Sequence, residues 1–242
     1  MSPAGKENLD MQLHEALEYI VVGDGEYVST GKRNLQFFLI PMVHWPDSMF
    51  TYCREDEILF SSNVFGQHYV SSERFVDELG IDVVMREAAK YYANIILLYG
   101  EQVKKVFEKL ENLSFSTMVP SHGLIGQRKE DIEKIIDVYQ RWAEHRIQNR
   151  AVIIYDTMWN STKMIAYSVK NSLAKEEIPV EIFDLKINHI SDIVASILFS
   201  CFIFIGSAVL NNQILPTVGA LLTYLEGLKP QNRYVFTFGS YG

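Results

Sequence analysis

The sequence has few cysteines, no excess of basic residues and no glycine-rich nucleotide motif. Its two cysteines, Cys53 and Cys201, are too few for a disulfide framework or a zinc ribbon, so a reducing, cytoplasmic compartment is expected. The net charge is −8, and this acidic balance argues against nucleic acid as a partner, because such proteins usually carry a basic face. Hydrophobic residues make up 48% and charged residues 21% of the 242 residues, a globular composition that excludes a disordered chain.

The sequence also lacks a convincing membrane segment. Residues 1–7 have no apolar core of the kind found in signal peptides. Residues 193–210 carry no charge and approach the length of a spanning helix. Small residues interrupt this stretch, and residues 201–205 are rich in the aromatic and branched side chains that favour strands. We therefore predict a short helix that leads into a buried strand, and no membrane partner.

The part of the chain before about Arg150 predicts strands followed by helices. Short apolar runs separated by turn-forming residues predict an antiparallel or mixed sheet. Apolar residues at helical spacing predict one long helix and then a second one. The predicted strands are residues 19–22, 35–40, 50–53 and 58–60, with turns at 23–25 and 54–57, and the predicted helices are residues 73–110 and 130–148.

After Arg150 strands and helices alternate, which predicts a doubly wound parallel sheet. The predicted strands are residues 151–155, 180–183, 201–205 and 234–238, and the predicted helices are residues 161–173, 191–199 and 213–228. A sheet of this class normally continues beyond its fourth strand, so the carboxyl-terminal edge is expected to be cut short. The sequence thus predicts an α/β protein with domains at residues 1–148 and 149–242.

A hydroxyl-rich loop follows the first strand of the alternating half. Its residues 157–162 read TMWNST, and the hydroxyls of Thr157, Ser161 and Thr162, together with free N–H groups at a helix start, form a cradle for an anion. The loop lacks the glycine fingerprint of dinucleotide sites and the Walker sequence, so a single phosphate, as on FMN, fits better. Plain N-capping by Ser161 or Thr162 is the alternative interpretation.

Two further loops follow the third and fourth strands of this half, at residues 206–212 and 238–242. Ligands bind at the carboxyl ends of strands in open α/β sheets. Trp159 and Tyr241 are suited to contact a planar ring, although surface packing is the alternative for both. The candidate cofactor-binding residues are Thr157, Met158, Trp159, Asn160, Ser161, Thr162, Ser207, Ala208, Val209, Leu210, Asn211, Asn212, Gly239, Ser240, Tyr241 and Gly242.

Four segments resemble motifs of the flavodiiron proteins (A-type flavoproteins), in which a metallo-β-lactamase-like domain precedes a flavodoxin-like domain. Residues 154–164 resemble the family's flavin-phosphate loop. Residues 41–50 (PMVHWPDSMF), 59–66 (LFSSNVFG) and 119–123 (VPSHG) resemble segments that hold metal ligands. The motifs occur in the family's order. The resemblance implies the C-terminal part of a metallo-β-lactamase-like αββα sandwich, followed by a flavodoxin-like doubly wound sheet that lacks its last units.

The resemblance also implies an iron site. By resemblance, His44 and His122 are iron ligands, and Asn63 stands where the family usually has a bridging aspartate. The family's His-x-Glu-x-Asp-His cluster, upstream of His44, is absent from this sequence. A neutral amide does not supply the anionic bridge that two irons favour. We expect an incomplete diiron site, in a chain truncated at both ends.

In the family, FMN takes electrons from a donor such as a rubredoxin-like protein. It passes them to a diiron centre that reduces dioxygen or nitric oxide. The subunits assemble head to tail, which implies a homodimer here, or a partner chain that supplies the missing ligands. The resemblance therefore implies an FMN-binding electron-transfer oxidoreductase. The alternative is a non-enzymatic flavin-binding or interaction remnant of a truncated or split gene, whereas a lactamase-type hydrolase lacks the metal cluster that activates water.

Overall fold

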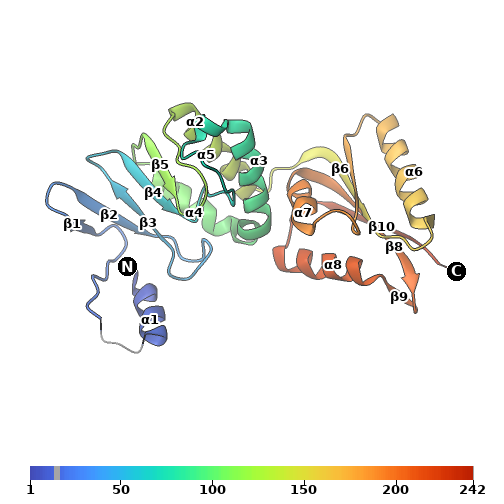
Figure 1. Cartoon of the computed structure of the whole chain (residues 1–242), viewed down its shortest axis with the longest axis horizontal. Coiled ribbons are helices and arrows are strands. Elements are labelled where there is room, and N and C mark those ends of the chain that lie inside the picture. Colours follow the sequence, from blue (N-terminus) through green and yellow to red (C-terminus); the bar gives the residue numbers. More distant parts are fainter. Residues whose placement is uncertain (14–16, 242) are drawn as a thin grey trace. The chain divides into compact units, whose positions relative to one another are not determined.

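The computed structural model describes residues 1–13 and 17–241. The chain forms two compact units, one of residues 1–91 with 99–144, the other of residues 92–98 with 145–242. The sequence-based domain limits at residues 148 and 149 stay a prediction. Each unit has its own sheet (Figure 1).

The first unit is built on a five-stranded mixed sheet in the order β1-β2-β3-β4-β5. The first four strands pair antiparallel, and β5 lies parallel to β4. The mixed sheet expected from the sequence is thus confirmed. The strands are β1 (Tyr27–Ser29), β2 (Asn34–Leu39), β3 (Met49–Cys53), β4 (Ile58–Ser62) and β5 (Thr117–Pro120), and the α-helices are α1 (Pro3–Gln12), α2 (Val76–Leu79), α3 (Ile81–Tyr91), α4 (Gly100–Leu110) and α5 (Lys129–Ala143).

One predicted strand in this unit was wrong, and two strands of the unit were missed. Residues 19–22 form no strand: the Met1 ammonium donates to the Ile20 carbonyl at 2.8 Å and the Val22 N–H to the Met1 carbonyl at 2.9 Å. Pairing with a single residue gives no ladder, so the extended run does not become a strand. Strands β1 and β5 were missed, because runs of three and four residues are too short to separate from the surrounding turns by alternation alone.

The single helix predicted over residues 73–110 was also wrong, because the helix changes type along its length. A first turn stops at Gly80, whose φ is +99°, a value that favours glycine. After α3 the chain forms a π-helical turn at Tyr92–Ile96 and a 3₁₀ turn at Leu97–Tyr99 before α4 begins. In the π-helical turn, the Asn94 amide donates to the Ser191 carbonyl and accepts from the Tyr224 hydroxyl, both at 3.0 Å. These tertiary contacts accompany the π-helical turn, which the apolar periodicity of the sequence does not predict.

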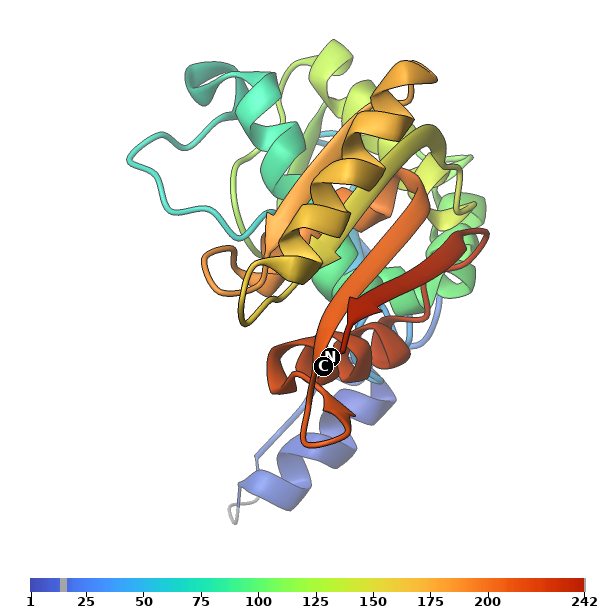
Figure 2. The same ribbon diagram turned by 90° about the vertical axis from the view of Figure 1, so that its right-hand side faces the viewer.

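The second unit contains a parallel sheet in the order β10-β8-β6-β7, which confirms the predicted architecture. Helix α6 covers one face, and α7 and α8 cover the other (Figures 1 and 2). The strands are β6 (Gln148–Tyr155), β7 (Val180–Asp184), β8 (Ser200–Leu210) and β10 (Tyr234–Ser240), and the helices are α6 (Ser161–Lys175), α7 (Ile190–Phe199) and α8 (Pro216–Leu228).

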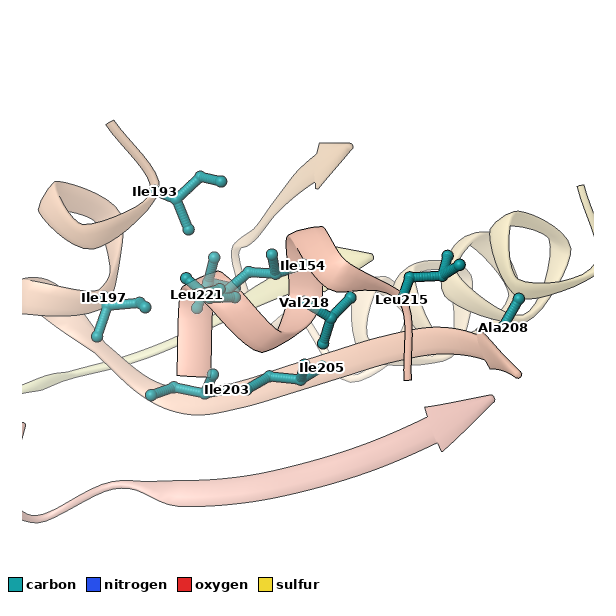
Figure 3. Close-up of a cluster of buried hydrophobic side chains, with 10 residues drawn as sticks. Ile154, Ile193, Ile197, Ile203, Ile205, Ala208, Leu215, Val218 and Leu221 are labelled. Atoms are coloured by element: carbon teal, nitrogen blue, oxygen red, sulfur yellow. The ribbon is translucent and has the colours of Figure 1, made fainter. Parts of the chain in front are cut away.

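Branched aliphatic side chains fill the space between this sheet and helices α7 and α8 (Figure 3). Ile154 from β6 and Ile203 from β8 meet Val218 and Leu221 from α8, and all four are at most 2% exposed. Burying one such side chain contributes about 1.5–3 kcal/mol. Strand β6 is covered on both faces, since residues 151–154 are fully buried. This explains why its sequence is a continuous apolar run rather than an alternating one.

The third strand continues further than predicted. Strand β8 runs through Leu210 and folds back on β9 (Gln213–Ile214) as a hairpin. Asn211 and Asn212 form its turn with φ of 51° and 60°, the backbone that two-residue hairpins require. Helix α8 consequently begins at Pro216 rather than at residue 213. Residues 206–210 and 239–240, predicted as loops, belong to strands β8 and β10.

The membrane prediction concerned residues 193–210. The structure divides this stretch between helix α7 and strand β8, as predicted. Among the described residues, no helix combines the length and the apolar character that crossing a bilayer demands.

Candidate functional site

The loop between β6 and α6 leaves a helix start without a side-chain cap. Asn160 is the N-cap residue with a left-handed φ of 67°, and its side chain makes no capping hydrogen bond. The alternative in which Ser161 or Thr162 merely caps the helix is therefore wrong, because both lie inside α6. The first N–H groups of an α-helix have no partner within the helix. They form, with the macrodipole, a site suited to an anion.

Two buried hydroxyls lie at this loop. Thr157 is 6% exposed, and its Oγ1 atom is buried with no hydrogen-bond partner among the described residues. Thr162 is fully buried, and its Oγ1 atom lies 2.9 Å from Ser240 Oγ of strand β10. A buried hydroxyl left without a partner is unfavourable by about 1–3 kcal/mol. A phosphate oxygen would supply the partner that Thr157 lacks.

The three loops predicted from the sequence contribute to one cavity. Its volume is about 320 Å³, and it lies at the carboxyl ends of β6, β8 and β10. Trp159 and Tyr241 present their rings there and are 85% and 91% exposed. These residues fit a flavin phosphate beside a planar ring. The cavity is lined by Met158, Trp159, Ser161, Ala208, Val209, Ser240 and Tyr241.

The remaining candidate residues lie outside that lining, including Thr157, Asn160 and Thr162 at the start of α6. Ser207 Oγ donates to the Ala208 carbonyl at 2.8 Å and accepts from the Leu215 N–H at 3.0 Å, so it anchors the hairpin. Leu210, Asn211 and Asn212 form the tip of the β8–β9 hairpin. At Gly239, a Cβ atom would lie 2.4 Å from the Ser207 carbonyl oxygen, so the close approach of two strands requires glycine there. Gly242 lies outside the described residues.

Sequence reasoning missed two charged residues at the loop. Asp156 follows β6 directly and is 3% exposed. It accepts the Thr157 N–H at 2.6 Å and lies 3.2 Å from the Lys186 ammonium. The sequence feature that could have identified them is an aspartate directly after a continuous apolar strand. A carboxylate buried in that position needs hydrogen-bond donors or a positive charge beside it.

The three candidate metal ligands follow strands of the first unit. His44, Asn63 and His122 come after β2, β4 and β5 respectively. The structure adds His68, whose ring centroid lies 5.0 Å from that of His122. Burial lowers the pKa of His44, and the neighbouring His122 and His68 lower it further. Burial and His122 likewise lower the pKa of His68.

A buried glutamine joins the two segments that carry Asn63 and His122. Gln67 is 1% exposed. Its amide donates to the Phe65 carbonyl at 2.6 Å and accepts the Leu124 N–H at 3.0 Å, and its own N–H donates to the His122 carbonyl at 3.1 Å. The Tyr91 hydroxyl donates to the Asn63 carbonyl at 3.1 Å. These bonds hold the candidate ligand loops against each other.

This donor set does not fit a pair of irons. Two imidazoles and a neutral amide lack the carboxylates that diiron centres use. Over residues 1–13 and 17–241, no three His, Cys, Asp or Glu side chains are placed to hold a metal ion.

Sequence comparison separates the chain into the same two parts. The model of the ODP family beta lactamase matches residues 11–123, and that of flavodoxin matches residues 153–242. The first part therefore has a β-lactamase-like fold and the second a flavodoxin-like fold, as predicted. A nitric oxide reductase of Moorella thermoacetica is 42% identical over 231 residues, which cover 95% of this chain and 57% of that relative.

Solved structures agree with the sequence relatives. The rubredoxin oxygen:oxidoreductase of the anaerobe Desulfovibrio gigas is 34% identical, with a TM-score of 0.95 over 100% of this chain and 61% of that one. A flavodiiron protein from Giardia intestinalis is 30% identical, with a TM-score of 0.96 over 100% of this chain and 59% of that one. The chain thus spans about three fifths of the length of the proteins it matches.

Proposed function

Since this chain belongs to the flavodiiron family, we propose that it is an FMN-binding electron-transfer oxidoreductase of the kind that reduces oxygen or nitric oxide. The observation that carries the proposal is the cavity at the carboxyl ends of β6, β8 and β10. A flavodoxin-like sheet with an uncapped helix start and an unpartnered Thr157 hydroxyl matches the needs of a flavin phosphate.

The residues of this chain would bind and orient the flavin. The first N–H groups of α6 and the hydroxyls of Thr157 and Ser161 would hold the phosphate. Thr162 would act by fixing Ser240 at the cavity wall. Trp159 and Tyr241 would cover the ring faces. When bound, FMN supplies the one- and two-electron redox chemistry, while the protein provides its placement.

The flavin requires an electron donor. We propose a rubredoxin-like protein, because one relative is named a rubredoxin oxygen:oxidoreductase. We further propose that iron chemistry needs carboxylates beyond the described donor set, supplied by a partner chain or a second copy in a head-to-tail homodimer. A cytoplasmic location agrees with two free thiols, Cys53 and Cys201.

Flavin titration tests the proposal. We expect FMN to bind more tightly than riboflavin, because riboflavin lacks the phosphate. Thr157→Val removes the unpartnered hydroxyl at nearly constant shape, and we expect it to weaken FMN binding by about tenfold, the value of one hydrogen bond to a charged group. Ser168→Ala is the matched control, since its hydroxyl bonds the Met164 carbonyl on the exposed side of α6. Equal affinity for both flavins would refute the phosphate assignment.

A second candidate function rests on the donor set at His44, Asn63 and His122. Without carboxylates there, the chain would serve as a flavin-binding or interaction module without diiron chemistry. Nitrous oxide production from nitric oxide by the reduced chain, loaded with FMN and iron together with a chain that carries the His-x-Glu-x-Asp-His segment, supports the oxidoreductase. Flavin binding without that product supports the module.

A further inference from the structure

An ion pair beneath the phosphate loop joins three elements of the second unit. Asp156 follows β6 directly, Lys186 lies in the segment after β7, and Thr217 lies in the first turn of α8. The Lys186 ammonium lies 3.2 Å from Asp156 Oδ1, and the Thr217 hydroxyl donates to Asp156 Oδ2. The Asp156 side chain is 5% exposed and that of Lys186 is 50% exposed.

These contacts occupy both backbone groups of Thr157. Its N–H donates to Asp156 Oδ1 at 2.6 Å, and its carbonyl accepts from the Lys186 ammonium. The Thr157 N–H is therefore not available to a phosphate, and the hydroxyl is the polar group of this residue that lacks a partner. The ion pair fixes the peptide that presents this hydroxyl.

The backbone of Lys186 is itself held in place. Its N–H donates to Asp184 Oδ1 at 2.9 Å, and the preceding N–H, of Leu185, donates to the Tyr155 carbonyl at 2.9 Å. These two bonds hold the backbone of Lys186 in place beside the end of β6. Its ammonium needs no large rearrangement to remain at the loop.

Charge gives the pair a second consequence. A buried carboxylate close to a bound phosphate would repel it, and low exposure leaves little water to screen that repulsion. The Lys186 ammonium balances the Asp156 charge at contact distance. Removal of the lysine alone would leave Asp156 uncompensated beside the phosphate loop, whereas removal of both charges would not.

We propose that Lys186 and Asp156 are positioning residues for the flavin phosphate: they fix Thr157, and Lys186 keeps the Asp156 charge from opposing the phosphate. The inference rests on the proposed FMN site. Asp156 and Lys186 would therefore contribute to the preference for FMN over riboflavin by positioning Thr157 rather than by contacting the flavin.

Flavin titration of charge variants tests the proposal, with thermal unfolding of the flavin-free chain as a second readout. We expect Lys186→Met to weaken FMN binding by about tenfold or more, the size of one charge-assisted hydrogen bond, and to change riboflavin binding by less than about threefold. Lys186→Arg retains the charge and should retain most of the FMN affinity. Lys175→Met, which removes an equal charge from the last turn of α6, should leave both affinities unchanged.

The double variant separates charge from mere loosening of the loop. Asp156→Asn keeps an acceptor for the Thr157 N–H and removes the uncompensated charge, although the Lys186 bond to the Thr157 carbonyl stays lost. We therefore expect Asp156→Asn/Lys186→Met to bind FMN at least about threefold more tightly than Lys186→Met alone. Continued weak binding by the double variant, in a chain that unfolds at the usual temperature, would overturn the charge argument. Unchanged FMN-to-riboflavin discrimination in Lys186→Met would overturn the inference while leaving the FMN site intact. Failure of the unaltered chain to bind FMN would overturn both.

Discussion

Replacing Gln67 by methionine should destabilise the first unit much more than its size suggests. Methionine has nearly the same length and fills the same space, so the main loss is hydrogen bonding. The amide donates to the Phe65 carbonyl and accepts the Leu124 N–H. Phe65 is fully buried and Leu124 is 3% exposed, so water does not replace the lost partner. Each orphaned buried group is unfavourable by about 1–3 kcal/mol, giving about 2–6 kcal/mol for the pair.

Tryptophan fluorescence makes the assay specific to this unit. The sequence contains three tryptophans, of which Trp45 and Trp142 lie in the first unit and Trp159 in the second. In a Trp159→Phe background, urea unfolding followed by fluorescence reports the first unit. With a slope of about 1–3 kcal/mol per molar urea, the unfolding midpoint for Gln67→Met should fall by about 0.7 M or more.

A surface glutamine provides the control for this prediction. Gln127→Met removes one bond to Asp77 Oδ1, at 3.2 Å and exposed to solvent. We expect its unfolding free energy to change by no more than about 0.5 kcal/mol. A Gln67→Met midpoint equal to that of the control would refute the argument that buried hydrogen bonds join the segments of Asn63 and His122.

Three further outcomes follow from the geometry. Gly239→Ala places a Cβ atom 2.4 Å from the Ser207 carbonyl oxygen and should destabilise the second unit by about 1–3 kcal/mol. Gly227→Ala, with open space around it, should stabilise helix α8 by about 0.5–1 kcal/mol. Trp159 fluorescence during thermal unfolding, in a Trp45→Phe/Trp142→Phe background, compares the two variants. Burial, followed by the charge of Asp184, raises the pKa of Tyr155 to about 12. The folded chain then retains a proton that the unfolded chain loses near pH 10, so the free energy of unfolding falls between about pH 10 and 12. Tyr155→Phe should therefore make the melting temperature fall less over this pH range. Anaerobic iron loading and elemental analysis should find fewer than two irons per chain, and two tightly held irons would contradict our interpretation of the ligands His44, Asn63 and His122.

Local chemistry in the sequence determined most of the second unit. The continuous apolar run at residues 151–155 predicted a strand buried on both faces, and the structure leaves residues 151–154 fully buried. Alternating strands and helices predicted the parallel sheet, since such connections have few solutions. The position of three loops after three strands predicted that they meet, because parallel strands end at the same edge of a sheet.

Contacts between distant residues were decided by the tertiary structure alone. The π-helical turn contains Asn94, which bonds to Ser191 and Tyr224, 97 and 130 residues further along the chain. The extension of β8 depends on its pairing with β9. The partners of Asp156 come from the segment after β7 and from the first turn of α8. Gln67 joins segments more than fifty residues apart. Periodicity records which face of an element is apolar, but a single buried polar group finds its partners only when the chain has folded.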